Sequence, residues 1–238
     1  MIKNITSLIK KEILNTTIDL TGDYSNIVID KMTDTEILEQ IPFVKTIVSG
    51  VNVYFAVKEI KFAQHFANFL IEFHNGKIDQ RKFDEFKNKL ECDIKYQEKV
   101  TELLTVMIDR NVVIEQSKLL AHLFKSHVKG KIDWDRFNTL CIILDKLHPH
   151  AYKALYRMGG ETNDLSRVYH TTKMANGRKD RRQYFNEDEE ALLVSSGLLI
   201  QYGTGYYASS LGNDLLKYAI FPLFVENGIY PFDDRDWI

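Results

Sequence analysis

Apolar positions recur at helical spacing through the middle of the chain. Between residues 58 and 147 they fall three and four residues apart in five successive segments, which is the periodicity of an α-helix with one buried face. The first segment carries Phe62, Phe66, Phe69, Leu70 and Phe73 and ends at Asn75-Gly76. The pattern therefore predicts a core of packed helices.

The tetrapeptide GKID occurs twice, at residues 76–79 and 130–133. Each glycine suits the left-handed residue just past a helix end, and each aspartate suits the N-cap of the next helix. A calcium-binding EF-hand loop is the rival interpretation, but alignment puts Lys82 and Arg136 where a bidentate glutamate is required. We therefore interpret each GKID as a hinge between two helices.

The helices joined by these hinges have clear apolar stripes, and a further helix over residues 94–110 is expected between the two hairpins. The residues expected to face inward are Phe83, Phe86, Leu90, Val100, Leu103, Leu104, Met107, Leu119, Leu120, Leu123, Phe124, Phe137, Leu140, Cys141 and Leu144.

Residues 2–14 also form an amphipathic stripe, with Ile9 and Ile13 on its apolar side and lysines off it. We expect this helix to pack on its own domain; contact with a membrane surface is the alternative. A capping box at Thr33 and Glu36 predicts another helix start. The longest apolar run, residues 46–57, is shorter than the roughly 20 residues that span a bilayer, so we expect a soluble, cytoplasmic protein with no transmembrane span.

The clear apolar stripes stop near residues 150–160, which indicates a domain boundary. Residues 187–221 then show a different order of elements. A helix ending in SSGLL is followed by two short strands, LLIQY and GYYAS, around Gly203-Thr204-Gly205, and then by a helix starting near Ser210. This order resembles the second half of a winged-helix domain.

The expected fold class is mainly α, with a multi-helix core of helical hairpins and a small α+β winged-helix-like C-terminal module. The expected parts are an N-terminal amphipathic segment (1–32), an α-helical core domain (33–155), the winged-helix-like module (156–225) and an acidic-aromatic tail (226–238).

The winged-helix resemblance implies a helix before the wing that enters the DNA major groove, where phosphates favour Lys and Arg. In this chain that helix opens with four acidic residues, 187–190, and the net charge of the chain is −2. A nucleic-acid-binding regulator is therefore the alternative function. Its candidate contacts are Lys173, Arg178, Lys179, Arg181 and Arg182.

The tail YPFDDRDWI interleaves acidic and aromatic side chains, and it is similar to the acidic tip of bacterial single-stranded-DNA-binding proteins. Such ends dock on basic, apolar pockets, although Phe232 and Trp237 packing back on the protein is the favoured interpretation. The candidate partner-binding residues are Phe232, Asp233, Asp234, Asp236, Trp237 and Ile238.

The sequence contains no motif of a phosphate-binding loop, a serine hydrolase elbow, a zinc protease or a C-x-x-C pair, and we expect no catalytic residue, metal or cofactor. His148 and His150 could ligate a metal together, but we interpret them as residues of a helix-to-loop junction. Cys92 and Cys141 lie in apolar helical patterns, so we expect two buried free thiols in a reducing compartment.

The whole layout resembles poorly characterised bacterial and phage helical proteins of the abortive-infection (Abi-alpha) type, and its hairpins are faintly similar to TerB-like domains. The Abi-alpha resemblance implies a role in phage–host conflict. We expect a non-enzymatic protein that binds a protein partner or self-associates.

Overall fold

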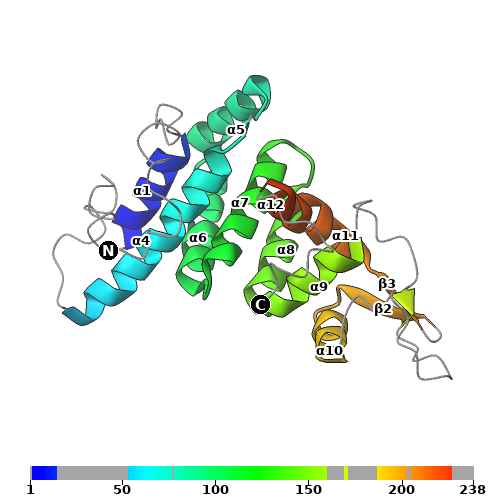
Figure 1. The fold of residues 1–238 in the computed structure, drawn as a ribbon. Helices are drawn as coiled ribbons and strands as arrows, with labels where there is room; N and C mark the ends of the chain where they lie inside the picture. The colour runs from blue at the N-terminus through cyan, green and yellow to red at the C-terminus, as the bar shows by residue number, and fades with distance from the viewer. Residues whose placement is uncertain are drawn as a thin grey trace, which may run out of the picture. The chain divides into compact units, whose positions relative to one another are not determined.

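A computed structural model describes residues 2–14, 53–76, 78–159, 169–170, 187–202 and 205–226, and helices dominate these ranges (Figure 1). The chain divides into two compact units, residues 1–138 and 139–238. None of the described helices is both long and apolar enough to cross a bilayer. The mainly α fold class expected from the sequence is confirmed.

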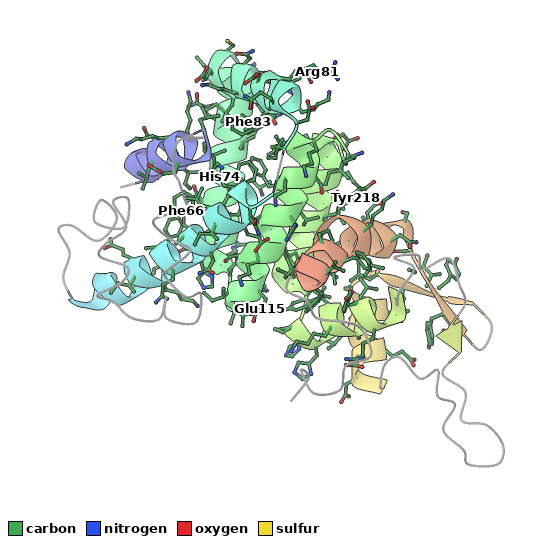
Figure 2. The ribbon with its side chains drawn as sticks, turned by 45° about the horizontal axis from the view of Figure 1, so that its top comes forward. Phe66, His74, Arg81, Phe83, Glu115 and Tyr218 are labelled. Atoms are coloured by element: carbon green, nitrogen blue, oxygen red, sulfur yellow. The ribbon has the colours of Figure 1, made fainter. Side chains whose placement is uncertain are left out.

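Helix α4 is the central helix of the N-terminal unit, because residues 65–70 are buried on every side. It packs mainly on α7 and also on α6, while α1 packs on α6. Figure 2 shows Phe66 and His74 on α4 in this unit. The helices of this unit are α1 (Ile2–Leu14), α4 (Val53–His74), α5 (Gln80–Cys92), α6 (Ile94–Arg110) and α7 (Ile114–Val128), and α8 (Trp134–Lys146) begins within it.

The core of this unit is aromatic, and Phe124 of α7 lies at its centre. The Phe124 ring centroid lies 5.2 Å from that of Phe73 and 5.6 Å from those of Phe86 and Phe137. These contacts join α4, α5, α7 and α8, so one ring connects four helical segments that the sequence pattern predicted separately. Aromatic pairs at such distances contribute about 0.5–1.5 kcal/mol each beyond their area burial.

Both GKID hinges have the predicted conformation. Gly76 and Gly130 have φ values of 74° and 69°, the left-handed conformation that glycine adopts without a steric penalty. Asp79 accepts from the backbone N–H of Lys82 at 3.2 Å, and Asp133 from that of Arg136 at 2.7 Å. The interpretation of the repeat as helix punctuation is confirmed.

Two other sequence predictions have different outcomes. Ile9 and Ile13 of α1 are fully buried, so packing of this helix on its own unit is confirmed. The prediction of a buried Cys92 is wrong, because Cys92 is the last residue of α5 and lies beyond the stripe that ends at Leu90; Cys141 is buried as expected. The capping box at Thr33 lies outside the described residues.

The C-terminal unit contains the predicted helix, hairpin and helix. The sheet has the order β1-β3-β2 with antiparallel pairs. Its elements are α9 (Pro149–Gly159), β1 (Tyr169–His170), α10 (Glu187–Ser195), β2 (Leu199–Tyr202), β3 (Gly205–Ala208), α11 (Ser210–Leu215), the π-helical turn η3 (Leu216–Ile220) and α12 (Phe221–Glu226).

A proline accounts for the π-helical turn between α11 and α12. Pro222 has no N–H to donate four residues back and its ring would clash with that carbonyl. The chain widens before it, and the N–H of Phe221 donates to the carbonyl of Leu216, five residues earlier. The helix continues after this turn, and Phe224 stacks on Tyr156 of α9 with ring centroids 4.6 Å apart.

Candidate functional site

Both groups of predicted contact residues lie outside the part of the chain that the structure describes. The basic group is Lys173, Arg178, Lys179, Arg181 and Arg182, and the tail group is Phe232, Asp233, Asp234, Asp236, Trp237 and Ile238. Both groups stay predictions. The described part of the C-terminal unit shows the helix and the hairpin that lie between these two groups in the sequence.

Two of the four acidic residues that open α10 bind neighbouring elements. Glu189 is buried and its Oε1 accepts from Nη2 of Arg157 on α9 at 2.6 Å. Glu190 accepts from the hydroxyl of Tyr206 on β3 at 2.5 Å. This hydrogen bond, with burial and the charge of Glu190, raises the pKa of Tyr206. These carboxylates therefore hold α10 in place.

The two faces of the β2–β3 hairpin differ in burial. Tyr206 shares a face with Leu199 and Ala208, and these three side chains are buried next to α10, which lies beside β2 (Figure 1), whereas Gln201 on the same face is exposed. On the opposite face Ile200 stands directly across from Tyr207, and Ile200 is 42% exposed. We name this Ile200–Tyr207 pair the open hairpin face.

A close contact of backbones fixes the hairpin against α11. The Ser209 N–H donates to the carbonyl of Leu198 at 2.9 Å, and its hydroxyl donates to the carbonyl of Gly197 at 2.7 Å. The same hydroxyl caps α11 by accepting from the N–H of Gly212 at 3.0 Å. A Cβ on Gly212 would collide with the Leu198 carbonyl oxygen, so this approach requires glycine.

The helix and hairpin carry no basic side chain. The sequences of α10 (EDEEALLVS), β2 (LIQY) and β3 (GYYA) contain neither Lys nor Arg. The exposed side of α10 presents Asp188, Ala191, Val194 and Ser195, with Val194 38% exposed. Affinity for phosphate backbones comes from cationic side chains, so these described elements offer nucleic acid no electrostatic attraction.

The N-terminal unit contains a serine–histidine pair that is structural. His65 Nδ1 lies 2.8 Å from Ser117 Oγ, and Ser117 is fully buried. The Asn111 amide forms hydrogen bonds on both sides in one orientation: its oxygen accepts from Ser117 Oγ at 2.9 Å, and its nitrogen donates to the Met107 carbonyl at 3.0 Å. His65 then donates to Ser117. Burial first, then the charge of Lys61, lower the pKa of His65 to about 4, against the opposing charge of Glu115, so this imidazole is a weak base on a serine that solvent does not reach.

A buried contact between a histidine and a carboxylate also joins α4 to α7, further along both helices. His122 Nε2 lies 2.9 Å from Glu72 Oε1, with both side chains almost fully buried. Burial alone would raise the pKa of Glu72, but the contact with His122 and the charges of Lys125 and Lys118 hold that pKa below its ordinary value. Lys125 donates to the carbonyl of Asn75 at 2.7 Å and so caps the end of α4.

Two more histidines connect helices at this end of the unit. His74 Nε2 donates to the carbonyl of Glu12 on α1 at 3.3 Å. His127 Nδ1 donates to the carbonyl of Ile132 in the second hinge at 3.1 Å, so its Nε2 accepts from the Tyr96 hydroxyl on α6 at 2.8 Å. Burial is the largest effect on both rings and lowers both pKa values.

Among the described residues no group of three His, Cys, Asp or Glu side chains could hold a metal ion. His148 Nδ1 accepts from the backbone N–H of His150 at 3.2 Å, and a new helix, α9, begins here at Pro149, where the sequence had indicated a change from helix to loop. No protein-family model, curated protein or solved structure matches this chain. The geometry of the chain itself therefore carries the functional argument.

Sequence reasoning missed the polar links inside both units. In the N-terminal unit a signal was present. His65, Asn68 and Glu72 interrupt an apolar helix at spacings of three and four residues, and buried polar side chains need hydrogen-bond partners. In the C-terminal unit Arg157 and Glu189 lie 32 positions apart, and no local pattern connects them.

Proposed function

We propose that the protein acts without catalysis of its own, through protein–protein contact at the open hairpin face, with a second copy of the chain as the partner. The observation that supports this most directly is the exposed Ile200, which stands across from the partly buried Tyr207 on a hairpin face without charge. Two copies meet there without like-charge repulsion, and burial of such side chains favours association.

The side chains of α10 oppose the interpretation as a nucleic-acid-binding regulator. A winged-helix protein that reads DNA uses the helix before the wing, yet α10 carries no cation and uses Glu189 and Glu190 to hold its own fold. The basic group at residues 173–182 is what still supports nucleic-acid binding. The resemblance to Abi-alpha proteins supports a setting in phage–host conflict.

The test is light scattering of the purified full chain over a range of concentrations, for the wild type and for Ile200→Glu. The wild type is expected to form a dimer, and Ile200→Glu is expected to weaken it at least tenfold. Ile94→Glu is the matched control, because Ile94 is 68% exposed on α6 in the other unit and its substitution should leave the dimer intact.

A nucleic-acid binding experiment distinguishes self-association from nucleic-acid regulation. Fluorescence anisotropy with labelled single- and double-stranded DNA and RNA at low salt should show no binding by the wild type. Salt-sensitive binding that disappears when Arg178, Lys179, Arg181 and Arg182 are replaced by alanine would support the regulator instead. A wild type that is monomeric at every concentration contradicts self-association.

A further inference from the structure

Four histidines carry side-chain links between helices in the described N-terminal unit, and all four lie on α4 and α7. His65 and His122 link α4 and α7 to each other, His74 links α4 to α1, and His127 links α7 to α6. Figure 2 shows His74 on α4. The packing of four helices thus depends on imidazoles.

Three of these imidazoles have a lysine as a neighbour. Lys61 lies one turn before His65 on α4 and lowers its pKa. Lys125, held at the Asn75 carbonyl, does the same for His74. For His127 the lysine is Lys89 of α5, whose ammonium lies 4.2 Å from the centroid of the Tyr96 ring. A proton on any of these rings creates a second positive charge beside the first.

Acidic groups near the three rings do not reverse this effect. Glu115 faces His65 and Asp133 faces His127, and each raises the pKa of its neighbour, but burial and lysine outweigh them. At His74 the opposing group is the Glu12 carbonyl. The aromatic rings around His127 are those of Tyr96, Phe124, Trp134 and Phe137.

His122 differs from the other three, because it faces the buried carboxylate of Glu72. Lysines lower the pKa values of the other three rings, so His122 serves as the internal comparison for them.

We propose that the N-terminal unit is an acid-responsive helical bundle, in which neutral His65 and His74 hold α7 and α1 on α4, neutral His127 holds α6 on α7, and protonation loosens these contacts. A histidine whose folded pKa lies below 6.5 contributes stability above pH 6.5, and this stability is lost as pH falls toward the folded pKa. For His65 that window runs from 6.5 to about 4. Each such histidine changes the folded-to-unfolded ratio by up to about tenfold per pH unit.

Thermal unfolding of the full chain, followed by Trp134 fluorescence in a Trp237→Phe background, tests this directly. The chain has two tryptophans, and the Trp134 ring lies 5.6 Å from the His127 ring, so it reports on this unit. The unfolding midpoint is expected to be lower at pH 5.0 than at pH 7.5. An equal or higher midpoint at pH 5.0 overturns the proposal.

A triple variant, His65→Gln, His74→Gln and His127→Gln, should lose most of the difference between the two pH values. His122→Gln is the matched control and should keep the full difference. A triple variant that folds and keeps the wild-type difference overturns the proposal.

Nuclear magnetic resonance titration of the wild-type histidine rings gives a reading that does not depend on the folding of any variant. The rings of His65, His74 and His127 should titrate below pH 6.5, and titration of all three at or above 6.5 overturns the proposal. Lys61→Gln, at an exposed position, should move the His65 titration to higher pH. An unchanged titration midpoint of His65 would show that Lys61 does not lower its pKa, and it would overturn the explanation that neighbouring lysines disfavour protonation of these rings.

Discussion

Arg157 and Glu189 lie 2.6 Å apart between Nη2 and Oε1, and this pair joins α9 to α10 in the C-terminal unit. Glu189 is buried, and Arg157 supplies a charged donor to its carboxylate. The acidic start of α10 is therefore part of the fold. A helix held in this way presents its remaining side chains at a fixed position.

Arg157→Met should destabilise the C-terminal unit by about 1–3 kcal/mol, because it leaves the buried Glu189 carboxylate without this donor. The check is chemical denaturation followed by circular dichroism. Lys82→Met is the control, since its pair with Glu85 on α5 is exposed and its loss should cause no measurable change. Equal effects of the two substitutions would contradict the assignment of a structural role to Glu189.

Gly212→Ala should be more destabilising than Gly197→Ala. The added Cβ at Gly212 meets the backbone carbonyl of Leu198, and such overpacking costs about 1–3 kcal/mol or more. At Gly197 the space is open, so the cost is that of a left-handed residue, roughly 1–2 kcal/mol. Unfolding midpoints of the two variants in urea measure the difference. The reverse order would contradict the close approach of α11 to Leu198.

Ser117→Ala should destabilise the N-terminal unit by about 1–3 kcal/mol, because it removes the shared partner of His65 and Asn111. Denaturation followed by Trp134 fluorescence checks this. Ser195→Ala, at an exposed position of α10, is the control and should be close to neutral. Labelling of Ser117 in the native protein by a fluorophosphonate serine probe would contradict its structural role.

Tyr96→Phe should change the stability of the protein at alkaline pH. Burial, then the charge of Asp93, raise the pKa of Tyr96 to about 12, whereas its ordinary value is 10.0. A raised folded pKa gives stability that is complete below pH 10 and is lost as pH rises toward 12. The wild type should therefore lose more stability between pH 10 and 12 than Tyr96→Phe, as measured by urea unfolding. Parallel curves would contradict the burial of this hydroxyl.

The elements of the fold that follow from local chemistry were predictable from the sequence. The GKID hinges depend on one glycine and one aspartate within four residues, and the helix stripes depend on spacing, so both could be read directly. The strands beside Gly203 were predictable for the same reason. Cys92 shows the limit of this reasoning. Its position nearly fits the apolar stripe of α5, but the helix ends at Cys92 and the residue is exposed.

The links that position the candidate site could not be predicted in the same way. Arg157 meets Glu189, and His127 meets Tyr96, only after the helices pack, and one sequence contains no signal for the choice of partner. The left-handed Gly197 was visible in SSGLL, but the need for glycine at 212 comes from the Leu198 carbonyl, a contact between distant segments.

The most direct test of the central claim is photo-crosslinking at the open hairpin face. Replacement of Tyr207 by p-benzoylphenylalanine in the full chain should give a covalent dimer on irradiation, because Tyr207 stands across from the exposed Ile200. The same probe at Ile94 should give none. Self-association through this face would be contradicted if the chain with the probe at position 207 gave no covalent dimer at the concentrations used for light scattering.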